Sequence, residues 1–209
     1  MRVELVSITE NAEKIIEMAG RTSYMSFDKV EDGSEKQFIK KLVQWGHMSI
    51  FEHVSASFRI SEVSRALTHQ LVRHRIGVAF TQKSQRYVSE SNFTYVTPPS
   101  IEKNAEANQI YKEFMAYVQD AYSKLIKLDI LKEDARYVLP NATETEIFMT
   151  ANFREWRHIF KLRCGKHAQW EIRILCIKIL EILKQKSPTA FEDFEIDYDT
   201  MTAKTICPD

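Results

Sequence analysis

The segment from Val63 to Ser89 places the strongest constraint on the fold, because it carries five Arg or Lys and two His side chains but neither Asp nor Glu. The chain as a whole is balanced, with 29 basic and 29 acidic side chains. Cationic donors at this density repel one another unless phosphate, carboxylate or polarised carbonyl groups lie among them. The fold must therefore bring anionic groups to this segment, and we predict that it binds phosphorylated ligands.

The composition predicts a single domain. Of the 209 residues, 44% are hydrophobic, and only five are Gly and five are Pro, so residues 1–209 can bury one full core. The net charge of zero argues against a nucleic-acid partner, because that affinity depends on a basic field over a whole face. The focused positive charge instead favours a small-molecule site.

The sequence gives no indication of export, a membrane or a metal. Its start lacks the apolar run of a signal peptide, and no segment approaches the roughly 20 apolar residues of a membrane span, so we expect a cytoplasmic protein. Cys164, Cys176 and Cys207 show no Cys-x-x-Cys spacing, and His47 and His53 lack a carboxylate-rich cluster. We therefore expect neither a catalytic cysteine nor a metal site.

Hydrophobic periodicity predicts an α+β fold. Apolar and polar residues alternate strictly over residues 54–60, which predicts a strand with one buried face. Residues 3–8 and 145–150 predict two further strands. Helices are predicted over residues 11–20, 36–45, 61–74, 101–128, 153–163 and 167–186.

Two of the predicted helices carry positive charge. Ser61 is a candidate N-cap for a helix on which Gln70, Arg73 and His74 would share one surface. The helix over residues 153–163 presents a second cationic surface, in which Glu155 is the single acid. The chain contains no Gly-x-Gly-x-x-Gly or Gly-x-x-x-x-Gly-Lys-Ser/Thr motif, so phosphate groups would have to bind side chains. The basic residues of this second surface are Arg154, Arg157, His158, Lys161 and Arg163.

The run Arg73-His74-Arg75, followed by Ser84-x-Arg86, resembles the signature of the flavin-dependent thymidylate synthases, usually written Arg-His-Arg-x-x-Ser-x-Asn-x-x-Ser-x-Arg. The chain departs from the signature at residues 76–81, because Ser84 follows Arg73 by eleven positions rather than ten and the first Ser and the Asn are missing. Other segments are similar to the family in the same order along nearly the whole chain. They are residues 21–24, 46–53, 136–140, 152–158 and 162–172.

The resemblance implies both a fold and a reaction. The fold is a single domain with a central, mainly antiparallel sheet flanked by helices, one of them long. The reaction is the reductive methylation of dUMP to dTMP, in which 5,10-methylenetetrahydrofolate supplies the carbon and NADPH reduces bound FAD. The resemblance further implies a homotetramer with active sites shared between subunits. A flavin reductant agrees with the lack of a candidate nucleophilic cysteine.

The resemblance also assigns site residues position by position. Arg163 is the catalytic candidate, because a guanidinium against the uracil edge favours loss of the ring nitrogen proton. Ser84 and Arg86 would hold the phosphate, with Ser84 as a binding group rather than a nucleophile. Arg157 and Lys161 match no family position and are interpreted as solvated charges. The residues expected to bind the nucleotide are Gln70, Arg73, Gln82, Lys83, Ser84, Gln85, Arg86, Arg136 and Arg163. The residues expected to bind the flavin are His47, Ser49, Arg73, His74, Arg75, Gln82, Asn152, Arg154 and His158.

Two alternatives stay open at this point. The first is a nucleotide- or RNA-binding protein without catalysis, which would use residues 73–75 as a single-strand groove. The neutral net charge and the lack of aromatic residues between the basic ones argue against it. The second is a family member that binds flavin but has lost methylation through the longer loop at residues 76–81.

Overall fold

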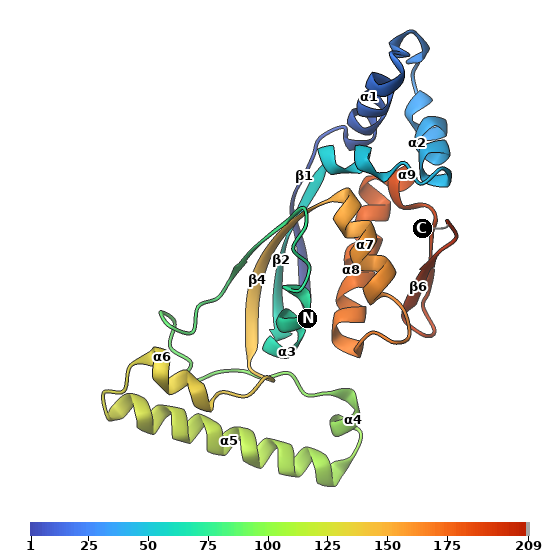
Figure 1. The fold of residues 1–209 in the computed structure, drawn as a ribbon. Coiled ribbons are helices and arrows are strands. Elements are labelled where there is room, and N and C mark those ends of the chain that lie inside the picture. The colour runs from blue at the N-terminus through green and yellow to red at the C-terminus, as the bar shows by residue number, and fades with distance from the viewer. Residues whose placement is uncertain (208–209) are drawn as a thin grey trace.

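A computed structural model describes residues 1–207 and shows an α+β fold around one antiparallel sheet (Figure 1). The strands of this sheet lie in the order β1-β2-β4-β3, and every neighbouring pair is antiparallel. The predicted fold class and the three predicted strands are confirmed, whereas β3 was not predicted. The strands are β1 (Arg2–Ile8), β2 (Ser55–Ser64), β3 (Val78–Gln82) and β4 (Glu144–Asn152), and a separate sheet pairs β5 (Phe194–Asp197) with β6 (Thr202–Thr205).

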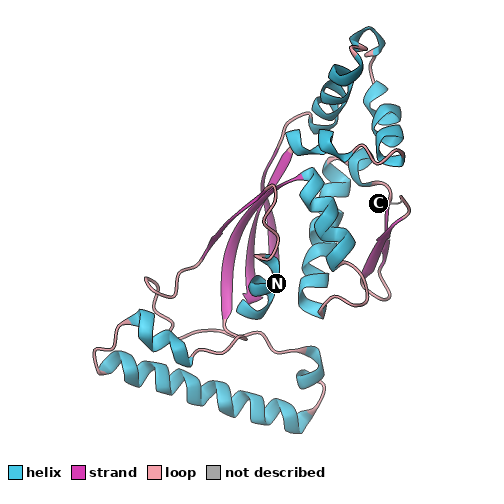
Figure 2. Cartoon of the chain, viewed as in Figure 1, coloured by secondary structure: helices cyan, strands magenta, loops and turns pink. Residues whose placement is uncertain are grey.

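Helices α7 and α8 lie on one side of the central sheet (Figure 2). None of the helices within residues 1–207 has the length and apolar character needed to cross a bilayer. The α-helices are α1 (Ala12–Tyr24), α2 (Ser34–Gln44), α3 (Arg65–Leu71), α4 (Pro99–Glu102), α5 (Ala105–Lys127), α6 (Lys132–Ala135), α7 (Phe153–Arg163), α8 (Trp170–Lys186) and α9 (Pro188–Phe191), and the 3-10 turns are η1 (Phe27–Lys29), η2 (Met48–His53) and η3 (Arg136–Val138).

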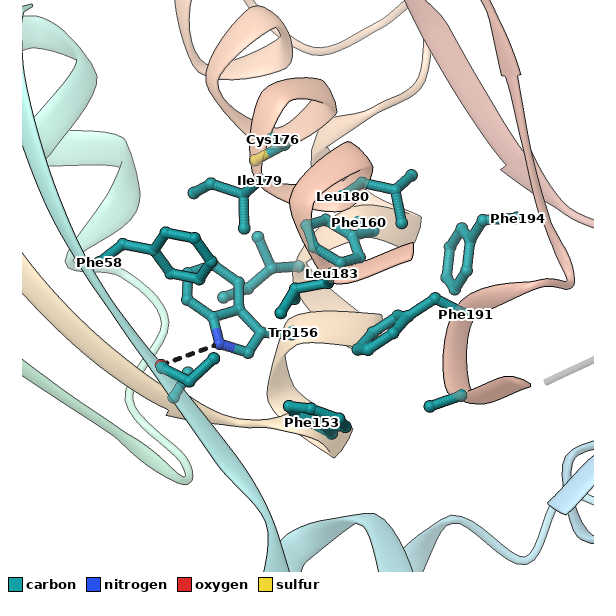
Figure 3. Close-up of a cluster of buried hydrophobic side chains, with 14 of the residues drawn as sticks. Phe58, Phe153, Trp156, Phe160, Cys176, Ile179, Leu180, Leu183, Phe191 and Phe194 are labelled. Carbon is teal, nitrogen blue, oxygen red and sulfur yellow. Dashed lines mark hydrogen bonds between the residues drawn. The ribbon is translucent and has the colours of Figure 1, made fainter. Parts of the chain in front are cut away.

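The main core is built on aromatic side chains between β2 and α7 (Figure 3). Phe58 of β2 packs edge-on against Trp156 with the ring centroids 5.3 Å apart, and Trp156 stacks on Phe160 at 5.9 Å. The Trp156 indole N–H donates to the Ala56 carbonyl at 3.3 Å, so its polar group is satisfied inside the core. Strand alternation turns Arg59 to the other face, where it remains exposed. This packing fixes α7, which carries the whole second cationic surface.

The long helix α5 lies apart from the main core, across the far end of the sheet from α1 and α2 (Figure 1). Its inner side contributes Met115 and Val118 to a small second core. Its outer side exposes Ile110, Phe114 and Tyr117, which recur at the spacing of one helix face. An apolar stripe of this kind is typical of a surface that contacts another protein.

The helix predicted from Ser61 begins later in the structure. A β-bulge between Ile60 and Val63, where Glu62 has a φ of 57°, lets β2 continue through Ser64, and Val63 and Ser64 stay paired with β4. Ser64 instead caps α3, and its Oγ accepts a hydrogen bond from the Leu67 N–H at 3.0 Å. The predicted helix start at Ser61 is wrong because the bulge depends on the pairing of β2 with β4, which lies about 80 residues further along the chain.

Three other helix boundaries differ from prediction for local reasons. Gly20 does not end α1 but lies inside it, where a Cβ atom would come within 2.6 Å of the Phe38 ring. The predicted helix over residues 101–128 is divided, because the side chain of Asn104 caps α5. The side chain of Gln169 caps α8, which therefore begins later than predicted. The starts of α5 and α8 are therefore set by side-chain caps, which periodicity does not reveal.

Arg157 is not the solvated charge that the sequence predicted. Only 2% of its surface is exposed, and its Nη1 and Nη2 donate to the Asp193 carboxylate at 2.7 Å each. Burial alone would raise the pKa of Asp193, but its bonds to Arg157 and Thr205 hold that pKa below its usual value. This buried pair ties α7 to the segment before β5, and it has a structural rather than a ligand-binding role.

Candidate active site

The basic segment and α7 meet at a tight junction between Gly77 and Asn152. Gly77 has φ +65°, and a Cβ atom there would lie 2.3 Å from Asn152 Nδ2. The Asn152 N–H donates to the Gly77 carbonyl at 2.9 Å, and Asn152 Oδ1 accepts from the Glu155 N–H at 2.8 Å as the N-cap of α7. Within residues 76–81, where the chain departs from the family signature, Gly77 thus forms a left-handed turn that contacts a predicted flavin residue.

Replacing Gly77 with alanine is expected to lower the free energy of unfolding by about 1–3 kcal/mol, because the left-handed conformation strains any residue with a Cβ. The added methyl group also has to displace Asn152 and so disturb the cap of α7. Urea titration measures the change. Gly165→Ala is the matched control, since a Cβ at Gly165 meets nothing within 4 Å, and a change of about 0.5 kcal/mol or less is expected there. Equal losses in both variants would contradict the junction argument.

The end of α3 corrects one expectation about the site. The helix ends at Leu71, so Gln70, Arg73 and His74 do not share one helix surface as predicted. Gln70 is half-buried and its side-chain amide donates to the Ala66 carbonyl at 3.3 Å. Arg73 is exposed and His74 is buried, so the turn after the helix points these neighbours to different environments.

His74 lies at the centre of a buried hydrogen-bonded group. Its Nδ1 is 3.1 Å from Glu155 Oε1, and the Arg163 Nε–H donates to its Nε2 at 3.2 Å. The ring of His158 packs edge-on at a centroid distance of 6.0 Å. Burial, and after it the charges of Arg163 and His158, lower the pKa of His74 to about 4. His74 is therefore a neutral imidazole at physiological pH, and the predicted catalytic Arg163 contacts it directly.

The predicted flavin residues at the end of β4 and on α7 line a hollow of about 270 Å³ beside this group. Asn152, Arg154 and His158 line it together with Glu52, Ile76 and Glu155. Arg154 forms an ion pair with Glu52 of η2. Ligand pockets usually enclose about 300–1,000 Å³, so this hollow has room for part of a flavin nucleotide.

Three other predicted flavin residues, His47, Ser49 and Arg75, are exposed and lie on segments that also carry Glu52 or Ile76, which line this hollow. His47 precedes η2 and Ser49 lies within it, and both side chains are exposed. The turn η2 packs against α7, and the exposed Trp45 ring lies edge-on to His47 at 5.8 Å. Arg75 is exposed in the turn before β3. Their donors are at the surface, and none of the three side chains lines the hollow.

A second hollow of about 330 Å³ contains Arg65, His69, Gln85 and Arg136 among its lining residues. Arg65 Nη1 and Gln85 Nε2 are buried donors without a hydrogen-bond partner. Burial lowers the pKa of Arg65, and the positive charge of Arg136 acts in the same direction, although Glu90 opposes both. Unpaired buried donors beside two guanidinium groups suit a phosphate. Arg65 was missed because it matches no motif position, although it lies in the acid-free segment.

The remaining predicted nucleotide residues already have protein partners. Lys83 and Arg86 form ion pairs with Glu90 and Glu133, so acidic residues from outside the segment partly neutralise it. Gln82 Nε2 donates to Thr68 and Thr145 at 3.0 and 3.1 Å. Ser84 Oγ accepts from the Arg86 N–H at 3.2 Å, and Arg136 Nε donates to the Glu133 carbonyl at 3.0 Å.

The two groups of site residues lie at opposite ends of β3. Val78 pairs with Ala151 next to the hollow on α7, whereas Gln82 pairs with Ile147 at the start of the second group. At about 3.3 Å per residue, the strand spans about 13 Å between them. Within one protomer Arg163 contacts the predicted flavin residue His74, whereas Gln82, predicted for both ligands, lies at the other end of β3 next to Lys83, Ser84 and Arg86.

His74, Glu155 and His158 also form the kind of compact group that can hold a metal ion, with their ligand atoms within 4.8 Å of one another. Both ring nitrogens of His74 are already engaged, one by Glu155 and the other by the cationic Arg163. A metal ion would have to displace a guanidinium group from its acceptor. The expectation that the protein holds no metal stays a prediction.

Comparison with known proteins gives consistent matches over most of the chain. Residues 4–189 match the family described as thymidylate synthase complementing protein. The chain is 40% identical over 201 residues to a flavin-dependent thymidylate synthase of Geobacter sulfurreducens, covering 92% of this chain and 86% of that protein. Similar matches are found with proteins of the same name from Corynebacterium diphtheriae, 37% identical over 206 residues (90% and 81% covered), and Clostridium tetani, 39% identical over 214 residues (92% and 86% covered).

Proposed function

The chain belongs to the family of flavin-dependent thymidylate synthases and is an enzyme of that class, and we propose that it methylates dUMP reductively to dTMP. In this proposal 5,10-methylenetetrahydrofolate donates the carbon and NADPH reduces bound FAD. The observation that carries the proposal is the group on α7 and the turn before β3, in which Arg163, His74 and His158 lie beside a hollow lined by Asn152 and Arg154.

The residues of the first group fit a flavin nucleotide. Arg154 offers a guanidinium to a phosphate, and the Asn152 side-chain amide and the His158 ring offer hydrogen bonds at the wall of the hollow. We expect His47, Ser49 and Arg75 to add donors from the nearby surface. Reduced FAD, when bound, supplies the reducing equivalents for the new methyl group.

The residues of the second group fit the phosphate of dUMP. Arg65 and Gln85 supply buried donors, and Arg136 and Arg86 supply guanidinium groups that can bind phosphate in a bidentate manner. Arg163 would act at the other end of the nucleotide. Its guanidinium stabilises the negative charge that develops when the uracil ring loses its nitrogen proton, and the ring then attacks the carbon donor.

We further propose a homotetramer whose active sites combine residues of different subunits. The separation of about 13 Å along β3 supports sharing, because one nucleotide has to meet both Arg163 and the phosphate residues. The apolar stripe of Ile110, Phe114 and Tyr117 on α5 supports assembly. A second subunit would also enlarge the hollow on α7 toward the volume of a whole cofactor site.

The function is tested on purified protein supplied with FAD, dUMP, NADPH and 5,10-methylenetetrahydrofolate. We expect a yellow protein with a flavin absorption spectrum and formation of dTMP that requires all three substrates. A protein that binds flavin but forms no dTMP would identify a family member that has lost methylation. A protein that binds no flavin after reconstitution would overturn the proposal and favour a non-catalytic nucleotide-binding role.

A further inference from the structure

The carboxylate of Glu155 has no role in the proposed reaction, yet it lies next to the group that performs it. It is 8% exposed, and the cap formed by Asn152 fixes its backbone N–H. Its Oε1 approaches His74 Nδ1, and on the other side of the ring His74 Nε2 accepts the Nε–H of Arg163. Glu155, His74 and Arg163 therefore form one continuous chain of hydrogen bonds.

Only one arrangement of protons satisfies both bonds. An arginine Nε–H can donate but cannot accept, so His74 Nε2 has to carry a lone pair. The ring proton then lies on Nδ1 and is donated to Glu155. The opposite tautomer would set two N–H groups against each other at Arg163 and two lone pairs against each other at Glu155. Burial and the charge of Arg163 disfavour the doubly protonated ring, in agreement with its lowered pKa.

We propose that Glu155 is a positioning residue for Arg163, acting through His74, whose Nδ1–H tautomer Glu155 stabilises by accepting that proton. The role of Arg163 in the reaction rests on the proposed function, whereas the tautomer does not. Only the Nε–H of Arg163 enters this chain of hydrogen bonds, so the donors on its two Nη atoms remain for a planar substrate. Glu155 thus holds the guanidinium in one orientation without touching the reacting atoms.

The tautomer is tested by ¹⁵N NMR of histidine-labelled protein, with the His74 signals assigned by comparison with His74→Asn. We expect His74 of the unaltered protein to be neutral at pH 7 with its proton on Nδ1. In Glu155→Leu, which lacks the acceptor, we expect a mixture of tautomers or a shift toward Nε2–H. In Glu155→Gln the side-chain carbonyl can still accept, so we expect the original tautomer to be retained.

Turnover is measured on the same three proteins. We expect kcat for dTMP formation to fall by about 10- to 100-fold in Glu155→Leu, by analogy with the loss of a partner that orients a metal-ligating histidine, while flavin binding stays intact. Glu155→Gln should recover most of this loss. A general loss of folding would instead lower flavin binding and kcat together and leave no rescue by glutamine.

The outcomes separate this inference from the proposed function. His74 protonated on Nε2, or on both nitrogens, at pH 7 in the unaltered protein would overturn it, and this measurement needs no Glu155 variant. An unchanged kcat in a folded Glu155→Leu protein would overturn it as well. An unaltered protein that makes no dTMP but carries the Nδ1–H tautomer would overturn the proposed function while supporting the chain of hydrogen bonds.

Discussion

Replacing Arg163 with alanine is expected to lower the rate of dTMP formation by about 10²- to 10³-fold, the usual cost of removing one preorganised donor that stabilises charge in a transition state. The reason is that the guanidinium faces negative charge that develops on the uracil ring as the reaction proceeds. Single-turnover assays with reduced flavin measure this step directly. Flavin binding should persist, because the predicted flavin residues around the hollow on α7 remain.

Two variants serve as controls for this prediction. Arg163→Lys keeps the charge but loses both the Nε donor to His74 and the planar fork, so we expect an activity between those of alanine and arginine. Arg2→Ala removes an exposed guanidinium in β1, on the opposite edge of the sheet from β3, and should leave the rate unchanged. If Arg163→Ala keeps the unaltered rate, then another residue activates the base.

Local patterns in the sequence predicted most of the elements but not the contacts between distant ones. Alternation over residues 54–60 and helical spacing over residues 153–163 depend on neighbours in the chain, and both are confirmed. The bulge at Glu62 depends on pairing with β4, and the burial of Arg157 depends on Asp193. Propensity and periodicity carry no information on such partners, so the sequence placed the start of α3 wrongly and treated the buried Arg157 as surface charge.

For the candidate site too, the sequence predicted some features and not others. The motif order predicted a flavin set, of which Asn152, Arg154, His74 and His158 come together in the structure. From the sequence, Glu155 could be described only as the single acid of a cationic helix. The structure shows that its carboxylate contacts the His74 ring, which explains an acidic residue at this position. The distance between the two ends of β3 was not predictable, because the sequence assigned the five residues of this strand to a loop.

This separation makes a strong prediction about mixed oligomers. Arg163→Ala and Arg86→Ala should each be nearly inactive alone, the first through loss of base activation and the second through loss of phosphate binding. Co-expressed with different tags and purified as mixed assemblies, they should regain about a quarter of the unaltered activity. The reason is that, in random assembly, about one site in four takes an intact Arg163 from one subunit and an intact Arg86 from another.

The matched control pairs Arg163→Ala with Arg154→Ala, two residues that belong to the same group within one protomer. If that group acts as a unit, every mixed site lacks one of the two arginines and no activity should return. Recovery in the first mixture but not in the second would locate the subunit boundary between the two ends of β3. No recovery in either mixture would mean that one protomer supplies the whole site, and the substrate or the segment after β3 would then have to cover the distance of about 13 Å.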